Sequence, residues 1–177
     1  MIDDLGILEG NYMDKKLRDA TILFLIKKGG GEITDLCLAM KKRSFGVNRW
    51  NGVGGKVEPE KETVEEAAIR ETQEEINVLA KSLEKVAELT FYYASNPDWD
   101  QLVHVYVVEN WDGEPSESEE MKPAWFKVKV IPYDDMWPDD LYWLPEVLKG
   151  YFVKATFKFG KDDLIASHTL DITKRTN

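Results

Sequence analysis

Short apolar runs separated by turn-forming residues recur along most of this chain, and this alternation predicts strands. The runs with this character span residues 21–26, 36–40, 86–93, 102–108, 124–130, 152–159 and 164–172. Three consecutive glycines at residues 29–31 predict a turn between the first two strands. Residues 160–163 predict a turn between the last two, which should therefore form a hairpin.

A different period, typical of a helix, runs from residue 63 to residue 76. Apolar or methyl-bearing side chains recur every four residues along it, at Val64, Ala68, Thr72 and Ile76. Such a narrow stripe can lie on a sheet while the other side of the helix stays in water. Thr63 and Glu66 have capping-box spacing, in which two side chains satisfy the free amide groups at the start of a helix.

The order of these segments bounds the fold. A second helix is predicted to begin at Asp139 or Asp140 and to end near Gly150. Strands interspersed with two helices favour the α/β class, with a mixed β-sheet packed between helices. The 177 residues suffice for one sizeable core, and no linker rich in proline and serine divides them. We therefore expect an N-terminal arm at residues 1–18, ordered by packing or by a partner, followed by a single domain at residues 19–177.

Charge and composition narrow the class of partner. The chain has 33 acidic and 23 basic side chains, and its formal charge of −10 would repel a nucleic-acid polymer. A small nucleotide is not excluded, because an accompanying metal ion neutralises phosphate charge locally. The single cysteine, Cys37, excludes an internal disulfide, and the sequence shows neither a secretion signal nor an apolar run of transmembrane length. We favour a cytoplasmic monomer that does not bind membranes.

Three glutamates give the clearest indication of chemistry. Glu71, Glu74 and Glu75 stand at positions i, i+3 and i+4 of the predicted helix, the spacing at which side chains converge. Like charges at that spacing repel unless a cation lies among them, and Mg²⁺ prefers carboxylate, water and phosphate oxygens as ligands. The pattern predicts metal-assisted attack on a phosphate. Glu65 and Glu66, by contrast, are interpreted as a solvated acidic face.

These glutamates belong to a longer pattern. Gly55 is followed after six residues by Glu62, and after seven more by the run Arg70-Glu71-Thr72-Gln73-Glu74-Glu75-Ile76-Asn77-Val78. The segment resembles the Nudix box of the hydrolases that act on nucleoside diphosphate-linked moieties. It departs from the box in a loop one residue longer before Glu62, in Thr72 where an aliphatic residue is usual, and in Asn77 where glycine is usual. Asn is the next best residue after Gly for the left-handed conformation that closes a helix.

The resemblance implies an α/β/α sandwich and a set of metal ligands. The ligands it implies for Mg²⁺, or for Mn²⁺ in its place, are Glu71, Glu74, Glu75, the backbone carbonyl of Gly54, and Glu120. Arg70 would orient one of the glutamates, and Glu74 or Glu75 would orient or deprotonate the attacking water. Lys41 is a candidate phosphate contact. The alternative for Glu120 is simple exposure within an acidic loop.

Outside the box, three further segments resemble the MutT-homologue oxidised purine nucleoside triphosphatases. They are residues 41–46 with 49–52, residues 117–126, and residues 135–140 with 142–143, in the order found in that family. The resemblance implies that Asn51, Asp139 and Asp140 read the base, that Trp137 stacks on it, and that Phe45 and Phe91 contact it.

The two adjacent aspartates suit base reading only if their protonation differs or their geometry separates them, because two buried anions side by side are unstable. One protonated and one ionised acid would offer a donor and acceptors to a purine edge. The alternatives are that an aspartate caps the second helix, and that Asn51, beside Gly52, is a turn residue.

The sequence therefore favours a Mg²⁺-dependent pyrophosphohydrolase that converts oxidised purine nucleoside triphosphates, of the 8-oxo-dGTP and 2-oxo-dATP type, to monophosphate and pyrophosphate. Another substrate within the class, such as ADP-ribose or an undamaged nucleotide, is one alternative. A nucleotide-binding module without catalysis is another, although the box keeps all three of its carboxylates.

Overall fold

The computed structural model describes residues 16–176. Its strands are β1 (Arg18–Gly29), β2 (Glu32–Lys41), β3 (Trp50–Asn51), β4 (Leu79–Lys81), β5 (Glu84–Tyr93), β6 (Gln101–Val108), β7 (Asn110–Asp112), β8 (Met121–Lys127), β9 (Tyr151–Phe159) and β10 (Ile165–Lys174). Its α-helices are α1 (Val64–Ile76) and α2 (Asp140–Leu148). Most of the predicted N-terminal arm, residues 1–15, lies outside the described residues.

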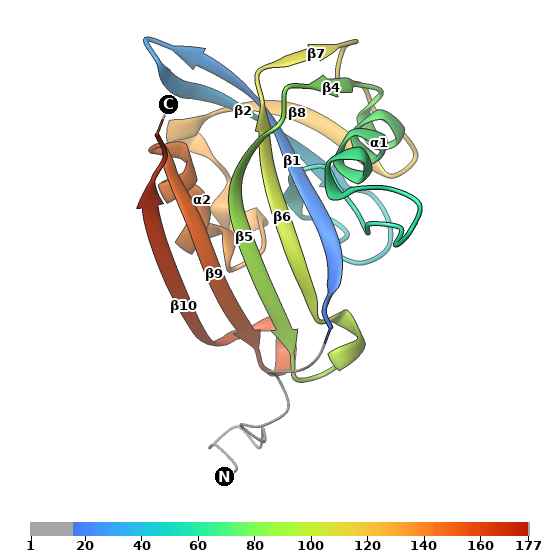
Figure 1. Cartoon of the computed structure of the whole chain (residues 1–177), viewed down its shortest axis with the longest axis vertical. Helices are drawn as coiled ribbons and strands as arrows, with labels where there is room; N and C mark the ends of the chain where they lie inside the picture. The colour runs from blue at the N-terminus through green and yellow to red at the C-terminus, as the bar shows by residue number, and fades with distance from the viewer. Residues whose placement is uncertain (1–15, 177) are drawn as a thin grey trace.

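In this part of the chain, one sheet of eight strands forms the centre of the molecule (Figure 1). Seven strands follow the order β10-β9-β5-β6-β1-β2-β3, and β8 pairs with β2. β1 runs parallel to β6, and β5 runs parallel to β9, whereas the other pairs of this sheet are antiparallel. The mixed sheet and the C-terminal hairpin predicted from the sequence are confirmed.

The two α-helices cover opposite faces of the sheet, α1 in front and α2 behind in the view of Figure 1. Trp143 and Leu144 of α2 share a buried cluster with Phe24 of β1. Ile76 of α1 shares the other cluster with Leu23, the residue next to Phe24. Successive residues of β1 therefore face different layers, which explains why this strand is apolar without interruption. The α/β/α sandwich is confirmed.

Cys37 of β2 lies in the cluster beneath α1 and is 2% exposed. Burial raises the pKa of its thiol to about 12. The thiol is therefore protonated at neutral pH and acts as a small apolar side chain.

Both ends of α1 follow the local sequence signals. Thr63 Oγ1 accepts a hydrogen bond from the Glu66 main-chain N–H at 3.2 Å, and Glu66 Oε2 accepts one from the Thr63 N–H at 2.8 Å. Asn77 closes the helix in the left-handed conformation, with φ of 60°. The hydroxyl of buried Thr72 donates to the Ala68 carbonyl at 2.7 Å, which satisfies it. These contacts confirm the capping box and fix where the glutamates of the helix stand.

The structure differs from the predicted strands in two respects. The strand expected at residues 124–130 is β8, which ends at Lys127, where its pairing with β2 stops opposite Asp35. Val128–Val130 form a short 3₁₀ turn instead. In addition, β3, β4 and β7 were not predicted, because two or three residues cannot display an alternating pattern.

Replacing Thr63 by alanine should lower the free energy of unfolding by about 1 kcal/mol, because the start of α1 loses its side-chain acceptor. Urea unfolding followed by circular dichroism measures the difference. Thr173→Ala, at an exposed position of β10, serves as the control and should change stability by less than about 0.5 kcal/mol. Equal stability of the Thr63 variant and the parent chain would contradict a structural role for the capping box.

Candidate active site

Residues 52–57 lie against β1 and place the glycine turn between that strand and α1. The main-chain N–H of Thr21 donates to the Gly55 carbonyl at 2.8 Å. A β-carbon at Gly54 would stand 1.9 Å from the Thr21 carbonyl oxygen, and one at Gly55 would stand 2.5 Å from the carboxylate of Glu71. The clash at Gly54 is with the main chain of β1, so this position requires glycine. A side chain at Gly55 would instead displace the carboxylate of Glu71 from its place beside the loop.

Arg70 connects α1 to this loop and neutralises several glutamates. Its Nη1 lies 2.8 Å from Glu71 Oε1 and 3.2 Å from Glu74 Oε2. Its Nε and Nη2 donate to the two carboxylate oxygens of Glu62 at 2.9 and 2.7 Å, a bidentate pair. The hydrogen bonds from Arg70 lower the pKa of Glu62 to about 2. Sequence analysis assigned no role to Glu62, which is the most tightly held partner of Arg70.

Lys41, the last residue of β2, lies between two carboxylates from distant parts of the chain. Its Nζ is 3.2 Å from Glu75 Oε1 and 3.3 Å from Glu120 Oε2. Glu75 is 5% exposed, and its Oε2 accepts a hydrogen bond from the Gly54 N–H at 3.2 Å. Burial raises the pKa of Glu75, against the opposing effect of Lys41. A hydrogen bond from Arg43 lowers the pKa of Glu120, so this carboxylate is ionised beside α1.

The donor atoms of this region suit a hard divalent cation. Glu75 and Glu120 already share one cationic group, the ammonium of Lys41. Among residues 16–176, the carbonyl oxygen of Gly54 accepts no hydrogen bond and is available as a further oxygen ligand. Within the same residues, no three acidic, histidine or cysteine side chains converge into a ready-made metal site, because each carboxylate is turned toward Arg70, Lys41 or Arg43. The metal roles of these residues stay predictions.

A cavity of about 290 Å³ opens beside this acidic region. Eight residues singled out in the sequence line it: Lys41, Phe45, Asn51, Gly54, Phe91, Trp137, Asp139 and Asp140. Of the box glutamates, Glu75 contacts two of these lining residues, Lys41 and Gly54, and Glu120 contacts Lys41. Ile22, Val103 and Met121 also line the cavity. Sequence analysis missed these three, since apolar residues of strands look like ordinary core.

Asp139 and Asp140 are almost fully buried, at 4% and 2% exposure. Trp143 Nε1 donates to Asp139 Oδ2 at 3.0 Å, and the Trp137 main-chain N–H donates to Asp140 Oδ2 at 3.1 Å. Burial raises the pKa of both carboxyl groups, and the charge of Asp139 raises the pKa of Asp140 further. Such a pair holds one proton more readily than none, which is the condition that base reading requires.

The structure does not support the capping alternative for Asp139, but it does show the turn contact expected for Asn51. Asp139 precedes α2 but, in the described chain, its side chain makes no capping hydrogen bond. Asn51 does make a turn contact, since its Oδ1 accepts from the Gly52 N–H at 2.7 Å. Its side-chain nitrogen has no hydrogen-bond partner within residues 16–176 and is available to a ligand.

Aromatic rings form part of the cavity wall. Phe45 stacks on Trp137 with ring centres 4.9 Å apart, and the guanidinium of Arg49 lies 4.4 Å from the centre of the Trp137 ring. Trp99 packs against Phe45 at 5.0 Å and edge-on against Tyr93 at 6.0 Å. Sequence analysis missed Trp99, although an aromatic residue at the end of the polar turn at residues 95–98 was a signal. Its contact with Phe45 makes Trp99 a support for this wall.

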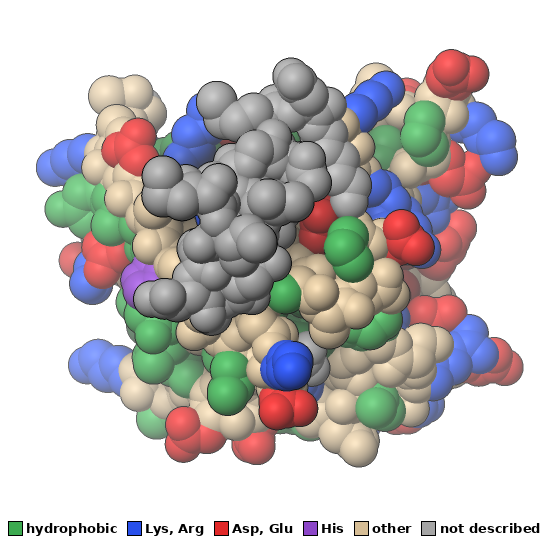
Figure 2. Space-filling view, turned by 90° about the horizontal axis from the view of Figure 1, so that it is seen from below, with side chains coloured by type: hydrophobic (Ala, Val, Ile, Leu, Met, Phe, Trp, Pro, Cys, Tyr) green, Lys and Arg blue, Asp and Glu red, His purple; other side chains and the backbone are tan. Residues whose placement is uncertain are grey.

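The end of the molecule at which β5 turns into β6 is seen from below in Figure 2. Outside the grey area, basic side chains there are interspersed with acidic ones, and apolar side chains lie between them. Positive charge is not gathered into a stripe on this visible surface. Within residues 16–176, no helix is both long enough and apolar enough to cross a membrane.

Three comparisons relate the chain to known proteins. The NUDIX domain model matches residues 16–147. A Mus musculus protein named oxidized purine nucleoside triphosphate hydrolase is 44% identical over 133 residues, which cover 75% of this chain and 84% of the mouse protein. A Danio rerio protein of the same name is 42% identical over 134 residues, which cover 76% of this chain and 85% of the fish protein.

The fold also has solved counterparts. The mutator MutT protein of Bacillus halodurans superposes with a TM-score of 0.73, covering 88% of this chain and 98% of that chain. The two sequences are 22% identical, so this likeness concerns the fold alone.

The raised pKa values of Asp139 and Asp140 have a measurable effect on stability. The folded carboxyl groups bind protons more tightly than the unfolded ones, whose pKa is about 3.9. Their contribution to stability is therefore fully present below that pH and is lost as the pH rises through the folded values. Asp140→Asn should consequently be more stable relative to the parent chain at pH 8 than at pH 4, as measured by urea unfolding. Asp135→Asn, at an exposed site, is the control. A stability difference for the Asp140 variant that does not change with pH would contradict the raised pKa.

Proposed function

The chain belongs to the NUDIX family of hydrolases, and we propose that it converts oxidised purine nucleoside triphosphates, of the 8-oxo-dGTP and 2-oxo-dATP type, into nucleoside monophosphates and pyrophosphate. The observation that carries this proposal is the cavity that combines a buried aspartate pair and Trp137 with the glycine loop and Lys41. The names of the mouse and fish relatives, both oxidized purine nucleoside triphosphate hydrolase, support the same substrate.

Divalent metal ions serve the hydrolases of this family, and we assign Mg²⁺ here, with Mn²⁺ as a substitute. The residues that would hold it are Glu71, Glu74, Glu75, Glu120 and the carbonyl of Gly54. When bound, the ion screens phosphate charge and acts as a Lewis acid toward the phosphate being attacked.

The other steps of the proposed reaction depend on protein side chains near the cavity. Lys41 lines the cavity at the edge of the acidic region and offers its ammonium group to the triphosphate. Arg70 holds Glu71 and Glu74 in place from one side. Glu74 or Glu75 orients or deprotonates the water that attacks phosphorus. The water oxygen becomes part of one product, and the bridging oxygen of the broken anhydride bond leaves with the other.

The base is read by Asp139, Asp140 and Asn51. One ionised and one protonated aspartate together present acceptors and a donor to the purine edge, and the free amide nitrogen of Asn51 presents further donors. Oxidation of a purine adds or rearranges such groups. A base that does not match leaves a buried polar group unpaired, which is how a site of this kind discriminates. Trp137 supplies a flat surface for stacking.

Glu75→Gln tests the catalytic part of the proposal. It should lower kcat for the release of pyrophosphate from 8-oxo-dGTP by about 100-fold or more, because the buried carboxylate beside Gly54 is lost. Pyrophosphate release is measured with and without Mg²⁺ over a panel of oxidised and normal nucleotides and ADP-ribose. Glu114→Gln, at an exposed position, is the matched control and should retain full activity. A fully active Glu75 variant, or turnover that chelators leave unchanged, would contradict the mechanism.

The aspartate pair is tested by comparing Asp139→Asn with Asp140→Asn. An amide resembles a protonated acid in having one donor and one acceptor side, but it cannot replace an ionised one. One variant should therefore lose base selectivity far more than the other. The expected loss is about tenfold in the ratio of kcat/KM for 8-oxo-dGTP to that for dGTP, since an unpaired buried group costs about 1–3 kcal/mol. Unchanged selectivity in both variants would overturn this assignment.

A further inference from the structure

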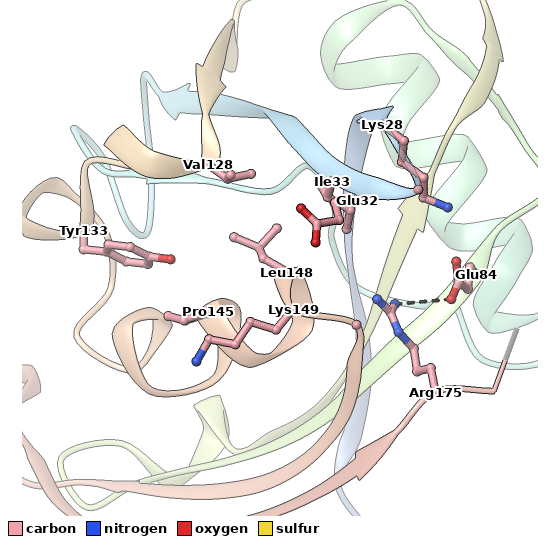
Figure 3. A pocket seen from close by; sticks show the side chains of 12 residues that line it. Lys28, Glu32, Ile33, Glu84, Val128, Tyr133, Pro145, Leu148, Lys149 and Arg175 are labelled. Carbon is pink, nitrogen blue, oxygen red and sulfur yellow. Dashed lines mark ion pairs between the residues drawn. The ribbon is translucent and has the colours of Figure 1, made fainter.

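A second and larger cavity, of about 500 Å³, lies at the other end of α2 from the aspartate pair (Figure 3). Five segments surround it: the turn between β1 and β2, the first residue of β5, the segment after β8, the last turn of α2 with the residues that follow it, and the residue after β10. Its apolar lining consists of Ile33, Val128, Pro145 and Leu148. The volume falls within the range of small-molecule sites, which is about 300–1,000 Å³.

Arg175 is the most constrained charged group of this cavity. Its side chain is 14% exposed, and its Nη2 donates to the Val147 carbonyl at 3.0 Å. Its Nη1 lies 3.3 Å from Glu84 Oε1, an ion pair drawn as a dashed line in Figure 3. Among residues 16–176, Nη1 is nevertheless buried without any partner in hydrogen-bonding geometry. Burial accordingly lowers the pKa of the guanidinium. A guanidinium carries five N–H donors, so this one has far fewer acceptors than it can use.

The main chain holds Arg175 firmly in this position. Its N–H donates to the Gly150 carbonyl at 3.1 Å, just after the end of α2. Arg175 is therefore anchored at two points before any ligand is present: its main-chain N–H is held by Gly150 and its guanidinium by the Val147 carbonyl. A donor fixed in advance loses little conformational freedom when it binds.

The charges that line the cavity favour an anion locally. They are the basic residues Lys28, Lys149 and Arg175 and the acidic residues Glu32 and Glu84. The balance is three positive against two negative groups, or +1, in a chain whose formal charge is −10. Lys28 is paired with Glu109 at 2.9 Å and Lys149 with Glu146 at 2.6 Å. Arg175 is therefore the cation whose donors remain most in need of a partner.

Tyr133 provides a second polar contact. Figure 3 shows its hydroxyl pointing into the cavity from the side opposite Arg175. This hydroxyl has no hydrogen-bond partner within the described part of the chain. Burial, and to a lesser extent the charge of Asp140, raises the pKa of Tyr133 to about 12, so the phenol remains a donor at neutral pH.

We propose that this cavity binds a small organic carboxylate, with the carboxylate group on Arg175 and an apolar body against Ile33, Pro145 and Leu148. The planar fork of a guanidinium matches the two oxygens of a carboxylate, and the apolar lining requires more of the ligand than a bare inorganic anion offers. The hydroxyl of Tyr133 meets a polar group on the far end of the ligand.

Octanoate is the probe for this proposal, compared with octanamide and octylamine, which share its chain but not its charge. Titration calorimetry with the full-length chain should show binding of octanoate and at least about tenfold weaker binding of the other two. Arg175→Gln should weaken octanoate binding by at least about tenfold, whereas Lys149→Gln, which removes a cation already paired with Glu146, should change it less than about twofold.

A variant that is expected to tighten binding distinguishes a specific effect on the site from a general loss of folding. Glu84→Gln removes the carboxylate that competes for Arg175 and should tighten octanoate binding. The proposal is overturned if Arg175→Gln or Glu84→Gln leaves the octanoate affinity unchanged. It is equally overturned if octanamide binds as tightly as octanoate, if sulfate does so, or if octanoate does not bind.

Discussion

The compensation of negative charge around α1 is the interaction on which the rest of the site depends. Glu71, Glu74 and Glu75 crowd one side of a short helix, and two cations hold them there: Arg70 from the helix itself and Lys41 from the end of β2. The same contacts fasten the glycine loop and the loop that carries Glu120. Because like charges at this spacing repel, the arrangement exists only while a cation lies among the carboxylates. The folded structure and the proposed chemistry therefore both require positive charge among these carboxylates.

In the proposed function, the residues that select the base come from the other face of the sheet. α2 buries Trp143 and Leu144 in the core, and this packing carries Asp139 and Asp140 out of water at the start of the same helix. Burial is unfavourable for two carboxylates, which is why their pKa values rise and why they are suited to a ligand that brings its own hydrogen-bonding groups. The sandwich has one helix on each face, and the glycine loop before α1 and the aspartates at the start of α2 nevertheless line the same cavity.

Local signals account for what could be predicted from the sequence. The capping box of Thr63 and Glu66 and the closing Asn77 are decided within a few residues, and the structure has both. Contacts between distant residues could not be predicted in this way. Lys41 is 34 residues from Glu75 and 79 from Glu120. No local sequence pattern around these residues indicates that they pair. The support that Trp99 gives to Phe45 likewise depends on two loops meeting in space. The cavity near Arg175 has no motif at all, since five separate segments enclose it.

The burial of Cys37 bears on the conditions in which such a hydrolase would work. Peroxide and related oxidants attack the thiolate form of cysteine, and they do so at accessible sites. Cys37 is neither ionised nor accessible, because it lies beneath α1 with a pKa of about 12. It is also the sole sulfhydryl of the chain. A cell under oxidative stress, the setting in which damaged nucleotides accumulate, would therefore leave this protein without a disulfide or sulfenic acid lesion to repair.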